Sequence, residues 1–170
     1  PHTPVMGRYR PPPPPKAPYI TAEGAARLRR ELDHLWSVER PEVTAQVSAA
    51  ALNGDRSENG DYIYGKRRLG EIDRRVRYLK KRLEVTQVVS EAPAELDRVF
   101  FAAWVVIESE EGEVRRVRIV GPDEFDQHPE YISVDSPVAR ALIGRRLDDE
   151  VVVVTPVGTT RFTILEIDYE

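Results

Sequence analysis

The chain lacks cysteine entirely and has a single methionine among its 170 residues. Without cysteine it can form no disulfide framework, no thiolate zinc site and no cysteine nucleophile. It also lacks any run of about 18 apolar residues, which excludes a recognisable transmembrane helix. Its longest apolar run, Val99 to Ile107, has the length of a strand. No signal peptide is recognisable, so we expect a cytoplasmic protein with no membrane partner.

Sequence motifs of self-contained enzymes are missing as well. There is no P-loop, no Gly-x-Gly-x-x-Gly and no Gly-x-Ser-x-Gly. The three histidines, His2, His34 and His128, are isolated, and none has a second ligand at metal-site spacing. We therefore expect that the chain is not itself an enzyme.

Charge is distributed unevenly along the chain. Residues 1–95 carry 17 basic and 13 acidic residues, a balance of +4, whereas residues 96–170 carry 8 and 16, a balance of −8. The two parts add up to the net charge of −4. Such asymmetry predicts two domains with different partners, one of which could be nucleic acid.

The beginning of the chain is rich in proline. Pro11 to Pro15 form a five-residue run without backbone donors, which favours an extended polyproline II or disordered segment. We therefore expect residues 1–17 to be a solvated tail, with a ligand for a proline-recognition domain as the alternative.

Residues 18–92 are predicted to form two helices. The first starts at Thr21, is interrupted or restarted at Pro41 and stops at Asn53-Gly54. The second, from about Tyr62 to Val88, carries a heptad seam of Leu69, Ile72, Val76, Leu79 and Leu83. Two narrow apolar seams joined by a short polar loop predict an antiparallel coiled-coil hairpin, an arm about 40 Å long.

The remainder, residues 97–170, follows a linker from Ser90 to Asp97 and has the two-residue period of strands. Five strands are expected: Val99–Glu108, Val114–Val120, Tyr131–Val134, Glu150–Thr155 and Thr160–Tyr169. Between the third and fourth, Ser136-Pro137 is a helix start, and that helix should end near Gly144. The fold class is therefore α+β: a helical hairpin followed by an antiparallel sheet with one short helix.

Three carboxylates, Asp55, Glu58 and Asp61, lie within seven residues at the predicted tip of the arm. The spacing of Asp55 and Glu58 fits a capping box at the start of the second helix. The same cluster could instead contribute ligands to Mg²⁺, which takes one or two protein carboxylates and obtains its other ligands from water or phosphate. Both interpretations remain open on spacing alone.

The second helix is strongly basic. From Lys66 to Arg82 there are nine Lys and Arg against two acidic residues, with Tyr62, Tyr64 and Tyr78 nearby. A solvated coiled-coil face would normally mix both signs, whereas one-sign excess with interleaved aromatics favours contact with a phosphate backbone and bases.

Three segments together resemble the GreA/GreB family of bacterial transcript-cleavage factors, with GreB the more similar. They are the tip from Gly54 to Asn59, the basic helix around Glu71 to Leu79, and the segment from Tyr131 to Leu142. The resemblance spans about Tyr19 to Tyr169, although Gly60 replaces an expected alanine. It implies an N-terminal coiled coil and a C-terminal FKBP-like domain.

The resemblance also implies a function and its residues. The C-terminal domain would dock on the β′ subunit of RNA polymerase at the rim of the secondary channel, through Asp135, Ser136 and Pro137. The arm would enter the channel as a monomeric factor and stimulate cleavage of the backtracked RNA 3′ end. By similarity, Asp55 and Glu58 would help hold the second catalytic Mg²⁺, while Asp61 would orient a water or a neighbouring group. The RNA would be guided by Lys66, Arg67, Arg68, Arg74, Arg75, Arg77 and Lys81.

Two alternatives are kept. One is a related factor that inhibits polymerase through the same channel, which loss of the tip carboxylates would mark. The other is a prolyl isomerase with a coiled-coil arm, for which Phe100, Phe101, Trp104 and Tyr131 could line an aromatic pocket.

Overall fold

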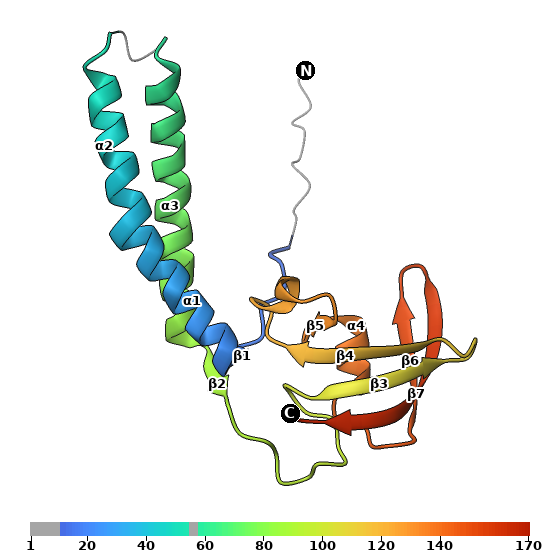
Figure 1. The fold of residues 1–170 in the computed structure, drawn as a ribbon. Helices are drawn as coiled ribbons and strands as arrows, with labels where there is room; N and C mark the ends of the chain where they lie inside the picture. The colour runs from blue at the N-terminus through green and yellow to red at the C-terminus, as the bar shows by residue number, and fades with distance from the viewer. Residues whose placement is uncertain (1–10, 55–57) are drawn as a thin grey trace, which may run out of the picture.

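The computed structural model describes residues 11–54 and 58–170. A long helical hairpin stands away from a small sheet domain, and a segment without regular structure, residues 90–97, connects the two (Figure 1). The arm consists of β1 (Tyr19–Thr21), α1 (Ala22–His34), the π-helix η1 (Leu35–Glu39), α2 (Arg40–Ala51), α3 (Gly60–Val85) and β2 (Gln87–Val89). None of the helices described here is long and apolar enough to cross a membrane.

Side-chain caps fix where the arm helices begin. Thr21 caps α1, as predicted, because its hydroxyl accepts from the Gly24 N–H at 3.1 Å. The cap of α3 is Asn59, whose side-chain oxygen accepts from the Tyr62 N–H at 3.2 Å. The predicted capping box that ended at Glu58 is therefore wrong, since the helix begins one residue after Asn59. Asn59 is the residue whose side chain accepts from an N–H of the first turn of α3.

The predicted seam holds the hairpin together. Ile72, Val76 and Leu79 of α3 are buried, and they form one apolar cluster with Leu28 and Leu35 of the opposite helix. Leu69 and Leu83 pack at the margin of this cluster. The heptad spacing thus places one side of α3 against α1, η1 and α2.

Pro41 does not break the first helix. The backbone stays in the right-handed helical region through η1, where the Arg40 N–H donates to the Leu35 carbonyl five residues earlier. Pro41 then lies in the first turn of α2, where proline is tolerated. The wider π turn lets the chain pass a residue that has no N–H and whose ring crowds the preceding turn.

A short parallel pair of strands, β1 and β2, closes the base of the arm, and the sequence pattern did not predict it. Tyr19 pairs with Gln87 and Thr21 with Val89. Each strand has only three residues, too few for a two-residue period to be visible. The pairing joins the beginning of α1 to the end of α3.

The C-terminal domain has a five-stranded sheet in the order β5-β4-β3-β7-β6. Its elements are β3 (Trp104–Ser109), β4 (Val114–Val120), the 3₁₀ turn η2 (Phe125–Gln127), β5 (Tyr131–Ser133), α4 (Pro137–Leu142), β6 (Glu150–Thr155) and β7 (Gly158–Asp168). All neighbouring strands are antiparallel except β4 and β5, which are parallel and joined by the connection that contains η2. The predicted helix start at Ser136-Pro137 is confirmed.

The core of this domain lies between one face of the sheet and α4. Val105, Ile107, Val117, Ile119 and Leu142 are fully buried in it. The predicted first strand begins later than expected, at Trp104, because a turn precedes it. In that turn Ala102 has a φ of 72° and the Ala103 N–H donates to the Phe100 carbonyl.

Candidate functional site

The tip of the arm presents a carboxylate without a structural task. Glu58 is exposed, and its side chain makes no hydrogen bond or ion pair within the described chain. Asp61 is exposed in the first turn of α3. Asp55 lies outside the described residues. Among the described residues, no three His, Asp or Glu side chains gather closely enough to hold a metal ion.

Asn59 braces the tip from below. Its Nδ2 donates to the Ala50 carbonyl at 2.7 Å, while its Oδ1 accepts from the Tyr62 N–H. One side chain therefore joins the end of α2 to the start of α3. Glu58 directly precedes this bracing residue in the chain.

The cations of α3 divide into two groups. Arg68 pairs with Glu39 at 2.5 Å and with Glu71 at 3.1 Å, and Arg75 pairs with both oxygens of Glu31 at 2.9 Å. Hydrogen bonds to these carboxylates raise the pKa of both guanidinium groups. Both of these predicted RNA ligands therefore hold the hairpin together.

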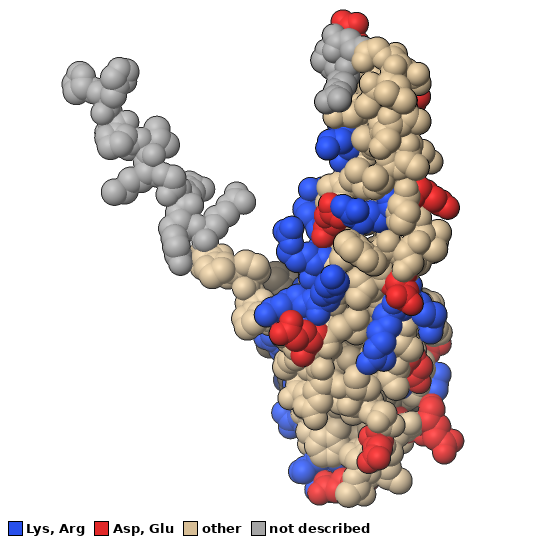
Figure 2. Space-filling model, turned by 90° about the vertical axis from the view of Figure 1, so that its left-hand side faces the viewer, with Lys and Arg blue, Asp and Glu red and all other residues tan. Residues whose placement is uncertain are grey.

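The other predicted RNA ligands have no ion pair within the described part of the chain: Lys66, Arg67, Arg74, Arg77 and Lys81. Arg67, Arg74 and Lys81 are seven residues apart, which places them on one side of α3, opposite the apolar seam. Figure 2 shows that the distal part of the arm carries few charged side chains and that charges gather nearer its base. All of these free cations thus lie on α3, between the tip and the base of the arm.

Asp123 forms the centre of the junction between arm and C-terminal domain. Its carboxylate is only 5% exposed and pairs with Arg82 of α3, Nε to Oδ2, at 2.6 Å. It also accepts a hydrogen bond from the Tyr78 hydroxyl, and Lys16 approaches both groups. The sequence pattern predicted that Tyr78 would offer its ring to a base. In the structure its hydroxyl is instead bound to Asp123 at the junction.

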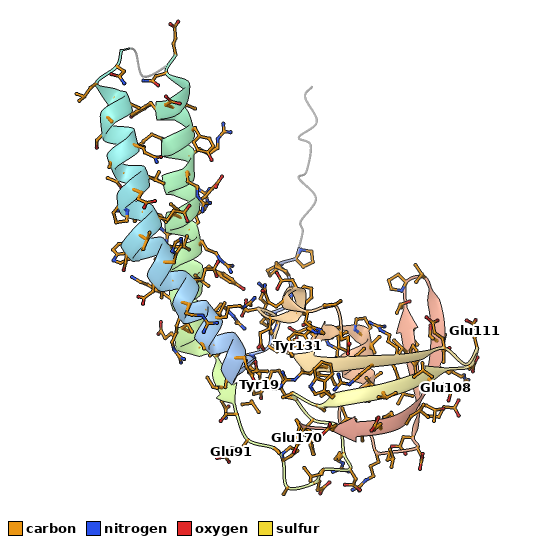
Figure 3. The ribbon with its side chains drawn as sticks, in the orientation of Figure 1. Tyr19, Glu91, Glu108, Glu111, Tyr131 and Glu170 are labelled. Carbon is orange, nitrogen blue, oxygen red and sulfur yellow. The ribbon has the colours of Figure 1, made fainter. Side chains whose placement is uncertain are left out.

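Glu124 makes a second, adjacent connection. Its buried carboxylate accepts from the N–H and the hydroxyl of Thr21 and from the Gly121 N–H. Gly24 of α1 packs so closely that a Cβ there would lie 2.0 Å from Glu124 Oε1. Tyr19 and Tyr131 lie at the same junction (Figure 3), where Tyr19 packs against the ring of Phe101 at 5.8 Å.

The predicted polymerase-binding residues lie at the start of α4. Ser136 caps the helix by accepting from the Ala139 N–H at 3.2 Å, and Pro137 is exposed in its first turn. Asp135 is half-buried and accepts from the Ala17 N–H at 3.0 Å. The end of the proline-rich segment thus runs beside this corner.

The aromatic side chains considered for a prolyl isomerase pocket have other neighbours. Phe101 contacts Tyr19 of the arm, and the guanidinium of Arg116 lies 3.8 Å from the centre of the Trp104 ring. Tyr131 packs edge-on against Trp104 at 5.9 Å. These rings support the junction and the outer face of the sheet.

Sequence reasoning missed the junction residues Asp123 and Glu124. Their loop between β4 and β5 has no motif that distinguishes it from an exposed acidic turn. One signal was available: Arg82 follows Leu79 of the seam by three residues, which brings its stem close to the buried side of α3.

Two family models cover most of the chain. Residues 18–88 match the N-terminal domain described as "Transcription elongation factor, N-terminal", and residues 93–169 match "Transcription elongation factor, GreA/GreB, C-term". The arm and the sheet domain are therefore those of a transcription elongation factor. The chain belongs to the GreA/GreB family.

Among its relatives, the transcription elongation factor GreB of Pseudomonas aeruginosa is 59% identical over 96% of this chain and 98% of its own length. GreB of Yersinia pestis is 60% identical over 91% of this chain and 90% of its own. A solved GreA/GreB structure from Nitrosomonas europaea is 22% identical, covers 90% of this chain and 100% of its own, and has a TM-score of 0.40. The predicted resemblance to this family, closest to GreB, is confirmed.

Proposed function

We propose that this elongation factor enters the secondary channel of RNA polymerase and stimulates endonucleolytic cleavage of the backtracked RNA 3′ end. The factor itself performs no bond cleavage; it completes the polymerase's own active centre. The observation that carries the proposal is Glu58, an exposed carboxylate at the end of a braced arm with no partner in the described chain. The carboxylate of Glu58 is not needed to cap α3, because Asn59 caps that helix.

In this proposal the tip contributes oxygen donors to a shared Mg²⁺ site. Mg²⁺ prefers carboxylate oxygens and retains several ligands from water or phosphate, so a pair such as Asp55 and Glu58 suffices when polymerase and RNA provide the others. When bound, a second metal ion supplies stabilisation of charge in phosphodiester cleavage. The role of the chain is to hold these carboxylates at the end of a stiff hairpin. Asp61, in the first turn of α3, would orient a water or a neighbouring group.

The free cations of α3 would guide the extruded RNA. Arg67, Arg74 and Lys81 repeat along the side of the helix opposite the seam, and phosphates are their natural counter-charge. Lys66 and Arg77 lie beside them. Arg68 and Arg75 contribute less to RNA, because their guanidinium groups are already paired with glutamates of the hairpin.

The acidic C-terminal domain would supply the affinity for polymerase. Asp135, Ser136 and Pro137 form a corner that is ordered by a helix cap and offers the exposed ring of proline. We expect residues 97–170 to fold alone, since their core is separate from that of the arm. This fragment should compete with the full chain for polymerase without stimulating cleavage.

The test uses a stalled, backtracked elongation complex with Mg²⁺ and the full-length factor, and measures shortened RNA. Glu58→Ala and Asp55→Ala should abolish the stimulation while leaving binding to polymerase nearly unchanged. Glu42→Ala, which removes an exposed carboxylate from the middle of the arm, is the matched control. If Glu58→Ala and Glu42→Ala stimulate cleavage equally well, the proposed role of the tip is wrong.

A further inference from the structure

A recess lies beside the tip of the arm, between α2 and α3. Its volume is about 370 Å³, and it is lined by Gln46, Ala49 and Ala50 of α2, by Asn53 just beyond the end of that helix, and by Asp61 and Tyr64 of α3. The volume is in the range of pockets that accept a small organic ligand. It is separate from the junction and from the free cations described above.

Small residues create the recess. At its lower end the helices approach closely, because a Cβ on Gly65 would lie only 2.5 Å from Val47 Cγ2. The alanines at positions 49 and 50 then leave room between the helices. Above them, Asn59 ties the Ala50 carbonyl to the start of α3. The walls are therefore held in place without a side chain filling the space.

The polar groups around this space have no partner within the described chain, and their chemistry suits a nucleobase. Tyr64 is 70% exposed, which is unusual for a large ring on a helix that packs against another. The side chains of Gln46, Asn53, Asp61 and Tyr64 make no hydrogen bond within the described chain. The two amides can both donate and accept, a carboxylate accepts from a ribose hydroxyl or a base N–H, and a tyrosine ring offers a stacking face.

The surroundings favour RNA over a protein surface as the occupant. From Val43 to Gly54 the chain has no charged residue, so Asp61 is the one charged side chain among the residues that line the recess. Arg67 follows Tyr64 by three residues and is therefore its neighbour one helical turn towards the base of the arm. A base-binding face followed by a free cation matches the alternation of base and phosphate in a single strand.

We infer that this recess receives an unpaired base of the extruded RNA, with Tyr64 as the stacking residue and Gln46 and Asn53 as hydrogen-bonding partners. The inference rests on the proposed function, because it takes the RNA 3′ segment to lie along the arm. It adds a contact to the base, whereas the free cations contact phosphates. The factor would thus hold the RNA at two chemically different points.

Cleavage rates at sub-saturating factor test this inference. Two backtracked complexes are compared, one with normal extruded nucleotides and one whose extruded nucleotides are abasic. On the normal complex, Tyr64→Ala should lower the rate between about fivefold and 150-fold, the equivalent of ~1–3 kcal/mol of stacking per base. Tyr64→Phe should keep most of the rate, because it keeps the ring. On the abasic complex the wild type and both variants should stimulate cleavage equally.

Ile63→Ala is the control, since Ile63 is also exposed but points about 100° away around the helix. Equal losses on both complexes would mean that Tyr64 contacts the polymerase wall, and no loss on either would remove the recess from the mechanism. Both results overturn the inference.

Photo-crosslinking separates this inference from the proposed function. RNA with a 4-thiouridine 3′ end should crosslink to the wild-type arm and lose the crosslink in Tyr64→Ala. A crosslink without any shortened RNA would support the recess and refute cleavage stimulation. Shortened RNA with a crosslink that survives Tyr64→Ala would do the reverse.

Discussion

Removing one partner of the ion pair between Arg82 and Asp123 should destabilise the protein far more than breaking any exposed pair of the described residues. Its side chains are 10% and 5% exposed, and the Nε to Oδ2 distance is 2.6 Å. Removing one partner of a buried pair typically costs about 3–5 kcal/mol, because the remaining charge stays buried without compensation. Asp123→Ala would also deprive the Tyr78 hydroxyl of its acceptor. We therefore expect a loss of about 3–5 kcal/mol in the free energy of unfolding.

Urea unfolding followed by far-UV circular dichroism measures this loss. At a slope of ~2 kcal/mol/M, the midpoint should fall by roughly 1.5–2.5 M. The matched control is Glu130→Ala, which breaks the Arg116 pair at 3.5 Å, with side chains 48% and 40% exposed. Exposed pairs contribute about 0–1 kcal/mol, so the control midpoint should move by less than about 0.5 M.

The double variant Arg82→Met, Asp123→Leu sharpens the test. Apolar side chains of similar volume can replace a buried pair at little cost, so the double variant should recover most of the stability that Asp123→Ala loses. A loss in Asp123→Ala no larger than that of Glu130→Ala would refute the reasoning. It would mean that Arg82 regains water because the arm and the C-terminal domain separate easily.

Three further outcomes are expected. Gly24→Ala should destabilise the junction, because its Cβ would displace Glu124 from three hydrogen bonds; a melting temperature equal to the wild type would contradict this. Arg74→Ala should weaken cleavage of deeply backtracked complexes, and its effect should shrink as salt rises, whereas Arg75→Ala should mainly lower the stability of the hairpin. A backbone N–H at the start of α1 lowers the pKa of Glu23, so its charged form stabilises the fold at neutral pH. The difference in melting temperature between wild type and Glu23→Gln should therefore vanish as the pH falls below the ordinary pKa of 4.5, and a difference that persists would refute it.

The sequence predicted the parts of the fold that depend on period and caps. The seam of α3 and the helix starts at Thr21 and Ser136 could be predicted, because each depends on residues that are close together in the sequence. The strands β4 and β6 have the predicted bounds for the same reason. The pair β1 and β2 was missed because its paired residues are 68 positions apart and its strands are too short to show a period.

Only part of the candidate site could be predicted from the sequence. The spacing of Asp55 and Glu58 imitates a capping box, and only the observed helix start assigns the cap to Asn59. Counting charges along α3 could not separate paired from free cations, since the partners of Arg75 and Arg68 lie on the opposite helix. Contacts between distant segments decided these points.

The π-helix η1 accommodates one residue more than the heptad spacing of the first helix requires. In the first helix the apolar positions Leu28, Leu32 and Leu35 continue as Val43, Val47 and Ala50, so eight residues separate Leu35 from Val43 where a heptad would have seven. A π turn absorbs one surplus residue without rotating the helix beyond it. The arm therefore holds one residue more than the heptad spacing needs, and a single deletion within residues 35–40 should keep the apolar stripe in register, at the cost of placing Pro41 inside a plain α-helix. A deletion between residues 43 and 50 would instead rotate the distal stripe by about 100° and misdirect the tip, so the effect of a length change depends on where in the arm it falls.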